Sequence, residues 1–471
     1  MSQGSRAATE LAHQPRCRDQ PRRGERCGRD RDSGPVKNNA AASAALHANT
    51  GCSRCCEGVH SMRWSSSALS PLSSAARLCA GIGRGPNDGD PLVAPITQST
   101  TFTRTRVGST PDHQYSRVSN PTVAALEAAL GRLEDAPPAV CFATGLAAET
   151  ALFLSLLKAG DHVVCGRSVY GGTTRLLQRL LPGFGVECAF VDSTDAARVA
   201  DALEPTTKLV FIETPSNPTL ELSDIAAIAD IAHRAGARLA VDNTFLTPAL
   251  QRPLDLGADV SLYSTTKFIE GHSVAMGGAV VSGDEDLLAR LRFIRKCTGA
   301  IQTPFNAWLT INGLKTLPLR MAQQSRSAET VAKWLAKQEA VETVRYPGLR
   351  DAAEAALARR QHPDGAGAVV SFEVRGGIEA GKRFVEALTR CTLVEHVGSV
   401  ETLITHPASM THADVPANER AACGLTDGLL RLSVGLEPVA SIIEDLAVGL
   451  QAIAPARTPA HSEAQPCPAN R

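Results

Sequence analysis

The sequence of 471 residues has no excess of either charge, since 48 basic residues balance 48 acidic ones. This balance gives no reason to expect a nucleic acid or an anionic membrane surface as a partner. No apolar run approaches the roughly 20 residues that a helix needs to cross a bilayer. We therefore expect a soluble, cytoplasmic protein that is long enough for two domains and a large core.

The thirteen cysteines lack the spacing of a structural metal site. Cys52, Cys55 and Cys56 form a candidate zinc-binding cluster, but a structural zinc ion needs four ligands and no second pair follows at suitable spacing. The cysteines scattered over residues 141–423 are typical of buried free thiols in a cytosolic protein. We expect no metal.

Residues 1–75 lack the periodicity of a helix or a strand and are rich in Arg, Ser, Ala, Gly and Cys. A mixed-charge run over residues 16–32 cannot bury apolar surface, so a disordered extension is the interpretation that we favour. A transit peptide is an alternative, although the acidic residues argue against it. Another is a later true start, at Met62. Residues 454–471, rich in Pro and Ala, are predicted to be a loose tail.

From about residue 140 the sequence alternates between short apolar runs and helical patterns. Short uninterrupted apolar runs are typical of buried parallel strands. They lie at His162–Cys165, Leu209–Ile212, Leu239–Val241, Val260–Tyr263 and Ala279–Val281. The clearest helix between them is Asp224–Ala235, with Ser223 placed to cap it and Gly236 to end it. The pattern predicts an open α/β sheet with ligands at the carboxyl ends of its strands.

The pattern after residue 310 indicates a second domain. Ile311–Leu335 is predicted to be a long helix, broken or kinked near Pro318, that leads into it. Three further strands are predicted at Ala368–Val374, Thr402–Thr405 and Leu429–Val434.

Asp242 and Lys267 each follow a predicted strand, within reach of the same edge of the sheet. A lysine that forms an imine and an aspartate that pairs with a pyridinium nitrogen are two groups that a pyridoxal phosphate (PLP) enzyme needs. Gly145 and Leu146 open a predicted helix, Ala147–Leu157, where free amides would favour a phosphate. By itself that turn is more typical of an ordinary capped helix than of an anion site.

Other residues near these strand ends suit a PLP site. Ser264 and Thr266 offer hydroxyl groups to the same phosphate. Tyr170 follows a strand end and precedes two glycines, where its ring can stack on a pyridine, although a core tyrosine at a glycine turn is as good an interpretation.

Ordered motifs over residues 76–453 extend this pattern. They are Pro95-Ile96-Thr97-Gln98-Ser99-Thr100-Thr101-Phe102, Tyr115-Ser116-Arg117-Val118-Ser119-Asn120-Pro121-Thr122, Tyr170-Gly171-Gly172-Thr173, Glu213-Thr214-Pro215-Ser216-Asn217-Pro218, Val241-Asp242-Asn243-Thr244-Phe245, Ser264-Thr265-Thr266-Lys267, Gly313-Leu314-Lys315-Thr316-Leu317 and His406-Pro407-Ala408-Ser409-Met410-Thr411-His412. With these motifs the chain resembles the Cys/Met-metabolism PLP enzymes of fold type I, which include cystathionine γ-synthase, cystathionine γ-lyase, methionine γ-lyase and the homoserine-ester sulfhydrylases.

The resemblance implies a large domain with a mostly parallel sheet and a smaller C-terminal α+β domain. It places an N-terminal arm that reaches a neighbouring subunit at residues 76–125, the PLP-binding domain at 126–315 and the C-terminal domain at 316–453. It also implies a homo-oligomer, with a dimer of dimers expected.

The resemblance assigns a role to each candidate residue. Lys267 would hold the cofactor, and Tyr170 would stack on its ring and serve as a second acid or base. Asp242 would pair with the ring nitrogen, and Asn217 would contact the phenolic oxygen. Arg431 would bind the substrate α-carboxylate through its planar fork. The remaining cofactor residues bind phosphate: Gly145, Leu146, Ser264 and Thr266 in the same chain, and Tyr115 and Arg117 in the pocket of the neighbouring subunit.

The sequence departs from the family at His396, where the usual pattern Ser-x-Gly-Gly-x-Glu has serine. That position normally helps to hold the substrate carboxylate, and a histidine there is bulkier and titrates near neutrality. A one-residue slip in the alignment is the alternative. Glu395, just before it, matches a glutamate of the family's γ-acting members.

The resemblance therefore implies an enzyme that acts at the γ carbon of a small-molecule amino acid. Cystathionine γ-synthase or γ-lyase is the activity that Glu395 favours. An O-acetyl- or O-succinylhomoserine sulfhydrylase is an alternative, favoured by the stretch Pro304-Phe305-Asn306-Ala307-Trp308, and methionine γ-lyase is another. A catalytically weakened, PLP-binding regulator is a further class, and the intact Lys267, Asp242 and Arg431 argue against it.

Overall fold

The computed structural model describes residues 87–411 and 424–454, together with Ser73, Ala75, Ala76, Cys79, Ile82, Ala413 and Arg420. The chain divides into two units, residues 1–63 and 64–471, and every described residue belongs to the second unit. The predicted extension, the cysteine cluster, the alternative start and the predicted tail lie outside the described residues, apart from Ser73, Ala75 and Ala454. Among the described residues no helix is both long and apolar enough to cross a membrane.

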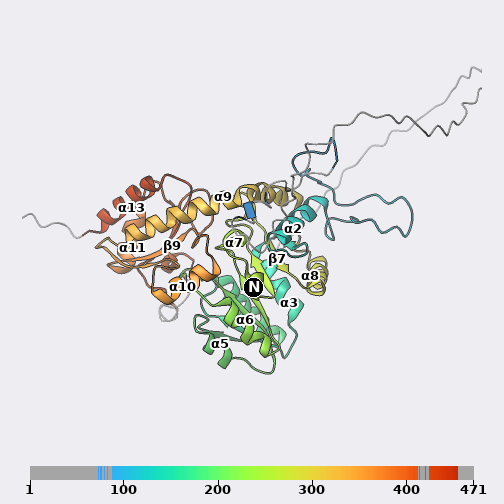
Figure 1. Cartoon of the computed structure of the whole chain (residues 1–471), viewed down its shortest axis with the longest axis horizontal. Helices are drawn as coiled ribbons and strands as arrows, with labels where there is room; N and C mark the ends of the chain where they lie inside the picture. Colours follow the sequence, from blue (N-terminus) through green and yellow to red (C-terminus); the bar gives the residue numbers. More distant parts are fainter. Residues whose placement is uncertain are drawn as a thin grey trace, which may run out of the picture. The chain divides into compact units, whose positions relative to one another are not determined.

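A seven-stranded sheet carries the first half of the described chain (Figure 1). Its strands lie in the order β1-β7-β6-β5-β4-β2-β3, and all of them except β7 run in the same direction. The strands are β1 (Val140–Phe142), β2 (His162–Gly166), β3 (Glu187–Val191), β4 (Thr207–Glu213), β5 (Arg238–Asp242), β6 (Val260–Tyr263) and β7 (Gly278–Ser282). The predicted strands correspond to β2, β4, β5, β6 and β7.

The prediction that every one of these strands is parallel is wrong for β7. This strand pairs antiparallel with β6 on one side and with β1 on the other. The connection over residues 264–277 is a loop and contains no crossover helix, which a parallel neighbour would require. Because β7 is buried along its whole length, its composition does not differ from that of a parallel strand.

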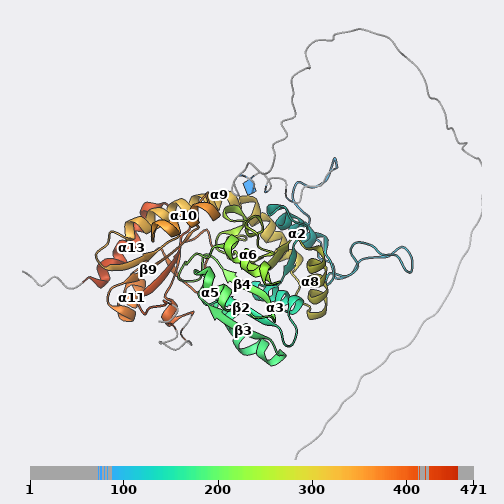
Figure 2. The same ribbon diagram turned by 60° about the horizontal axis from the view of Figure 1, so that its bottom comes forward.

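Helices cover both faces of this sheet (Figure 2). Alternate residues along a strand point to opposite faces, so Val163 packs with the helices α3 and α8 while Val164 packs with α6. The helices of this part of the chain are α2 (Pro121–Leu133), α3 (Gly145–Leu156), α4 (Gly171–Arg175), α5 (Ala196–Asp201), α6 (Ile225–Arg234), α7 (Thr247–Leu250) and α8 (Glu285–Thr298). Short helical turns lie at η2 (Leu176–Leu180), η3 (Leu181–Phe184) and η4 (Pro253–Leu256).

The predicted helix at Asp224–Ala235 is α6, but its cap is Asp224 and not Ser223. The Asp224 carboxylate accepts a hydrogen bond from the Ala227 amide at 3.2 Å. The Ser223 hydroxyl instead pairs with the Ser193 hydroxyl at 2.8 Å. Gly236 follows the helix with a φ of +71°, so it ends α6 as predicted.

The long helix α9 (Pro304–Leu335) leads from the first sheet to the second (Figure 1). It begins before the predicted Ile311 and remains helical through Pro318, so the predicted break is absent. Thr303 caps the helix and Pro304 occupies its first position, where a missing N–H costs no intrahelical hydrogen bond.

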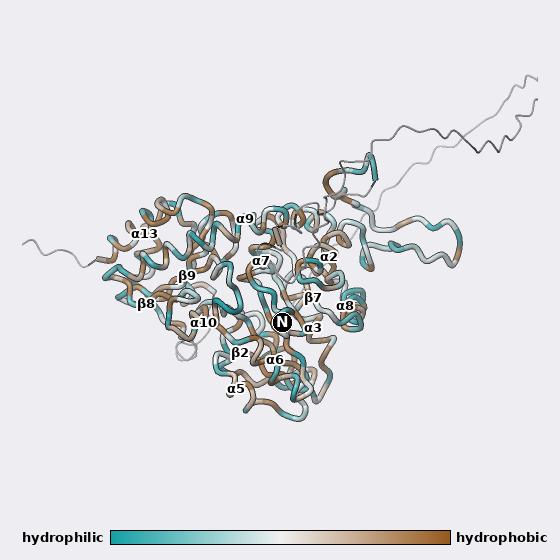
Figure 3. The backbone as a smooth tube through the Cα atoms, in the orientation of Figure 1, coloured by the Kyte–Doolittle hydropathy of each residue, from teal (hydrophilic) through white to brown (hydrophobic). Residues whose placement is uncertain are grey.

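The second sheet has five strands in the order β10-β11-β12-β9-β8 and is antiparallel except between β10 and β11. Its strands are β8 (Val341–Arg345), β9 (Val369–Val374), β10 (Thr392–Leu393), β11 (Leu403–Thr405) and β12 (Leu429–Ser433). The other elements of this part are α10 (Ala352–Gln361), α11 (Gly377–Glu386), η5 (Pro407–Ser409) and α13 (Val439–Ile453). Hydrophobic and hydrophilic colours alternate along α9 and α13 in Figure 3, as expected for helices with one buried face.

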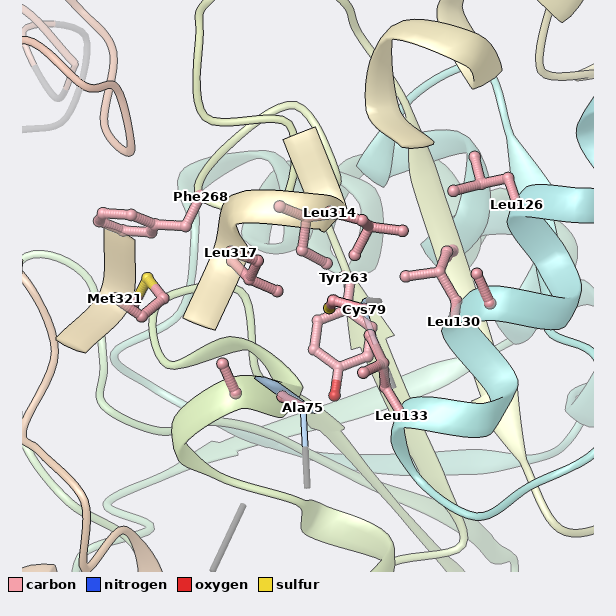
Figure 4. Close-up of a cluster of buried hydrophobic side chains, with 14 of the residues drawn as sticks. Ala75, Cys79, Leu126, Leu130, Leu133, Tyr263, Phe268, Leu314, Leu317 and Met321 are labelled. Carbon is pink, nitrogen blue, oxygen red and sulfur yellow. The ribbon is translucent and has the colours of Figure 1, made fainter. Parts of the chain in front are cut away.

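A buried cluster between α2, α9 and the sheet supports the segment that carries Lys267 (Figure 4). Tyr263 and Phe268, which lie on either side of this segment, are both fully buried in the cluster. Leu314 and Leu317 of α9 pack in the same cluster. The residues between Tyr263 and Phe268 therefore start and end at fixed points of the core.

Candidate active site

Most of the predicted site residues line one cavity of ≈ 500 Å³. Those from the first sheet follow the carboxyl ends of parallel strands, and two more come from the second sheet region. They are Gly145, Leu146, Tyr170, Asn217, Asp242, Ser264, Thr266, Lys267, Glu395 and Arg431. Three predicted residues do not line it, namely Tyr115, Arg117 and His396.

Lys267 lies just beyond β6, in a loop whose first turn is closed by a hydrogen bond from its own amide to the Ser264 carbonyl at 3.2 Å. Its amine contacts Nδ1 of His396 at 3.1 Å. Burial, and then the positive charge of Arg431, lower the pKa of Lys267 from 10.5 to about 8. The neutral amine that a nucleophile or base requires is therefore far more populated near neutral pH than it is in an exposed lysine.

Asp242 is the last residue of β5 and extends into the cavity beside Lys267. One of its carboxylate oxygens accepts a hydrogen bond from the Thr244 amide at 2.9 Å. Burial raises the pKa of Asp242 to about 6. A cation placed against this carboxylate would favour its ionised form.

The amino end of α3 forms the predicted anion site. Thr144 caps the helix by accepting a hydrogen bond from the Ala147 amide at 3.0 Å, and the amides of Gly145 and Leu146 belong to the first turn, which has no intrahelical acceptor. A β-carbon at Gly145 would lie 2.9 Å from the β-carbon of Ser264, so only glycine fits against this serine. The close approach places the helix end and the Ser264 hydroxyl together.

The Thr266 hydroxyl is engaged within the protein. It donates to the Gly277 carbonyl at 3.1 Å and accepts from the Gly277 amide at 3.0 Å. A phosphate contact by Thr266 would therefore require this hydroxyl to rotate, whereas the amides of α3 already point to the site.

Arg431 lies in the middle of β12 and is buried. Its guanidinium donates to Asn217 Oδ1 at 2.9 Å, to the His396 carbonyl at 3.0 Å and to the Thr405 hydroxyl at 3.1 Å. Because the carbonyl oxygen of the Asn217 side chain accepts from Arg431, its amide N–H groups are available to another acceptor. Burial lowers the pKa of Arg431 to about 10, so it remains a cation at neutral pH.

Two further buried acids line the cavity, Glu149 of α3 and Glu213 at the end of β4. Burial, and then the charge of Asp242, raise the pKa of Glu149 to about 8 and that of Glu213 well above its usual value. Glu149 accepts from the Thr173 hydroxyl at 3.1 Å, and Glu213 accepts from the Tyr170 amide at 2.7 Å. The latter bond fixes the backbone of Tyr170, whose side chain is half exposed at the cavity.

Tyr115 and Arg117 lie in the segment ahead of α2, away from the cavity of their own chain. The Arg117 guanidinium lies 5.5 Å from the centre of the Tyr115 ring and donates to the Lys296 carbonyl at 3.0 Å. Tyr115 remains 42% exposed, which leaves its ring free for a contact outside this chain.

Several lining residues were not predicted from the sequence, and three of them, Glu149, Arg175 and Glu213, are ionisable. Glu149 could have been recognised as a candidate site residue, because it is the one charged residue in the sequence of helix α3. Arg175 follows the predicted Tyr170 by little more than one helical turn, on the short helix α4. Glu213 opens one of the motifs but was not assigned a role.

The site residues fit pyridoxal phosphate. Each polar group of this molecule has a counterpart in the cavity: the α3 amino end with Ser264 for the phosphate, Asp242 for the ring nitrogen, Asn217 for the phenolic oxygen and Lys267 for the aldehyde. The cavity volume lies within the range of about 300–1,000 Å³ that is usual for ligand sites. Among the described residues no group of three or more His, Cys, Asp or Glu side chains is arranged to hold a metal ion.

The family described as Cys/Met metabolism PLP-dependent enzyme matches residues 80–451 of the sequence. The chain belongs to this family. It is 45% identical over 346 residues to the O-succinylhomoserine sulfhydrylase of Pseudomonas aeruginosa, covering 74% of this chain and 85% of that one. It is 43% identical over 373 residues to the L-methionine γ-lyase of Porphyromonas gingivalis, covering 77% and 93%.

The crystal structure of cystathionine γ-lyase from Lactobacillus plantarum, complexed with L-serine, superposes on the chain with a TM-score of 0.77 at 39% identity. The match covers 82% of this chain and 99% of that one. The predicted fold class, a PLP-dependent fold with a large sheet domain and a smaller second sheet domain, is therefore confirmed. So are the predicted family and its cofactor. In this family member, bound PLP supplies an electron sink for negative charge that develops at the substrate α carbon.

Proposed function

We propose that this PLP-dependent enzyme acts at the γ carbon of a sulfur amino acid or a homoserine ester and either cleaves or forms cystathionine, as a cystathionine γ-lyase or γ-synthase. The observation that carries the proposal is the pair of opposite charges, Arg175 and Glu395, in the same cavity as Lys267 and Arg431. Cystathionine has a second amino-acid group beyond its sulfur atom, with one ammonium and one carboxylate. Glu395 complements that ammonium and Arg175 complements that carboxylate, whereas the methyl group of methionine would use neither.

The residues of the chain divide the reaction between them. Arg431 binds the substrate α-carboxylate through its fork, which orients the α carbon. Lys267, once released from the cofactor, removes the α proton as a partly neutral amine. Lys267 or Tyr170, both at the cavity, then provides the proton that the departing γ substituent needs.

An assay of cystathionine, methionine, and O-acetyl- and O-succinylhomoserine with cysteine or sulfide tests the proposal. Rapid release of 2-oxobutyrate from cystathionine identifies a lyase, and formation of cystathionine from a homoserine ester and cysteine identifies a synthase. Activity confined to a homoserine ester with sulfide would overturn both.

Glu395→Gln separates cystathionine from the smaller substrates. We expect the KM for cystathionine to rise about tenfold, because one charged hydrogen bond to the distal ammonium is weakened. The KM for methionine should change less than twofold. Glu386→Gln, at an exposed glutamate of α11, is the matched control. Equal effects of Glu395→Gln on both substrates would contradict the assigned contact.

A sulfhydrylase is the second candidate, and one finding favours it. The relative from Pseudomonas aeruginosa, which is an O-succinylhomoserine sulfhydrylase, shares 45% identity with the chain. A succinyl group ends in a carboxylate that Arg175 would also complement. The sulfide arm of the assay decides between the two candidates.

We also propose a homo-oligomer, with a dimer of dimers expected, in which Tyr115 and Arg117 complete the phosphate site of a neighbouring subunit. Their position away from their own cavity supports this arrangement. Mixing inactive Arg117→Ala and Lys267→Ala subunits should then restore about a quarter of the wild-type sites, because a mixed dimer holds one intact pocket. No recovery after verified subunit exchange would contradict the shared site.

A further inference from the structure

His396 makes contact with two functional residues through different parts of its structure. Its ring nitrogen Nδ1 lies 3.1 Å from the Lys267 amine, and its backbone carbonyl accepts from Arg431 at 3.0 Å. The side chain therefore acts on Lys267, and the backbone acts on Arg431. A substitution of the side chain leaves the contact to Arg431 available.

The loop that carries His396 is held against Lys267 by its backbone. Gly398 has a φ of +87°, and a β-carbon there would lie 2.5 Å from the Phe268 nitrogen and 2.8 Å from the Lys267 carbonyl carbon. The Gly398 amide donates to the Ser433 hydroxyl of β12 at 2.9 Å. This close packing fixes the position of the His396 ring relative to Lys267.

Charge determines which nitrogen of the ring carries the proton. The charged and titratable groups around the pair are Lys267 itself, Arg431 of β12 and the adjacent Glu395. The other walls of the cavity carry Glu149, Tyr170, Arg175, Glu213 and Asp242. Burial, and then the charges of Lys267 and Arg431, lower the pKa of His396 to about 4. A neutral ring that accepts a hydrogen bond from the Lys267 amine at Nδ1 carries its own proton on Nε2, which is buried with no partner among the described residues.

We propose that His396 is a positioning residue for Lys267, whose amine donates a hydrogen bond to His396 Nδ1 whenever it is not bonded to the cofactor. The ring thereby stabilises the ammonium that Lys267 becomes on taking the substrate α proton. The proton moves from the α carbon to the Lys267 amine, and the ring contributes only a lone pair. This role rests on the proposed function of Lys267 as the base.

The first test measures the ionisation of Lys267 without a substrate. Full-length apoenzyme is mixed with PLP over a range of pH, and the growth of visible absorbance reports the neutral fraction of the Lys267 amine. An acceptor that stabilises the ammonium raises its pKa, so its removal lowers it. His396→Ala and the bulkier His396→Leu should both lower the pH midpoint of this absorbance titration by up to about one pH unit. His396→Asn, which keeps an acceptor near Nδ1, should retain the wild-type midpoint.

The comparison has internal controls. The ionisable groups of PLP titrate in the same way with every variant. The effect of His396 is therefore measured as the difference in pH midpoint between each variant and wild type. His233→Ala, at a half-exposed histidine that pairs with Asp259, is the matched control and should leave the midpoint unchanged. Identical midpoints in wild type, His396→Ala and His396→Leu would overturn the proposal.

The second test uses holoenzyme and L-norleucine, which has no γ leaving group, in deuterated water. We expect His396→Ala to slow α-proton exchange about tenfold at saturation, with KM changed less than twofold and with His396→Asn restoring most of the rate. A raised KM with an unchanged saturating rate would instead indicate direct contact with the substrate and would overturn the proposal.

The two tests separate this inference from the proposed function. If wild type does not exchange the α proton while the midpoint shift is present, the assignment of Lys267 as base fails and the contact with His396 stands. If exchange is rapid and independent of His396, the proposed function stands and the inference fails.

Discussion

Arg431→Lys tests how much of substrate binding depends on the planar fork of a guanidinium. Arginine satisfies Asn217 Oδ1, the His396 carbonyl and the Thr405 hydroxyl at 2.9–3.1 Å and is expected to hold the substrate carboxylate as well. A lysine keeps the charge but presents one nitrogen, so it cannot make all of these contacts. The substitution Arg431→Lys therefore separates the effect of the positive charge on substrate binding from the effect of the planar geometry.

The size of the effect follows from the contacts that are lost. Loss of one charged hydrogen bond to the substrate carboxylate costs about 1.5–3 kcal/mol. At about 1.4 kcal/mol for each factor of ten, kcat/KM should fall by about 10- to 150-fold. Two of the three internal hydrogen bonds are also lost, at about 1 kcal/mol each, so the midpoint of thermal unfolding should fall by a few degrees.

The assay compares kcat/KM for the best substrate with visible absorbance and circular dichroism of the same preparations. Arg383→Lys, at an exposed arginine of α11, is the matched control and should leave all three unchanged. A value of kcat/KM within threefold of wild type, in Arg431→Lys that is folded and loaded with cofactor, would refute the assigned role of the fork.

Three further changes address the cofactor residues. Asp242→Asn should lower the affinity for PLP, measured by absorbance titration, by at least about 100-fold, because a buried ring cation loses its partner. In wild type the affinity for PLP should be constant above pH 6 and should fall as pH drops through the Asp242 pKa of about 6, because protonation removes the carboxylate charge. In Asp242→Asn this fall in affinity at low pH should be absent. Gly145→Ala should weaken PLP binding about tenfold, because the added β-carbon displaces Ser264; an unchanged affinity would contradict the tight phosphate turn.

The sequence was sufficient to predict the elements that place the cofactor. The ends of β5 and β6, near Asp242 and Lys267, could be predicted because a buried strand is a short apolar run and a polar functional residue marks its end. The direction of β7 was not readable, since a fully buried antiparallel strand has the same composition as a parallel one. The partly exposed β3 and the charged β8 were missed because their patterns are mixed.

The contacts of individual side chains could not be read from residue types. The resemblance assigned the Thr266 hydroxyl to the phosphate, but this hydroxyl is hydrogen-bonded to Gly277. It assigned His396 to the substrate, but the ring of His396 contacts Lys267. Glu149 and Arg175 reach the cavity because α3 and α4 start at its edge, which depends on the arrangement of the sheet. The contact between Lys267 and His396 joins residues that are 129 positions apart in the sequence, so it depends on how the chain packs.

Identification of the lysine that bonds to PLP tests directly whether Lys267 is the cofactor lysine. The full-length holoenzyme is reduced with borohydride, digested, and analysed by mass spectrometry for the peptide that carries the cofactor. We expect the label on Lys267, and we expect Lys267→Ala to have neither the label nor the visible absorbance. A label on another lysine, such as Lys315, or visible absorbance that survives in Lys267→Ala, would contradict it.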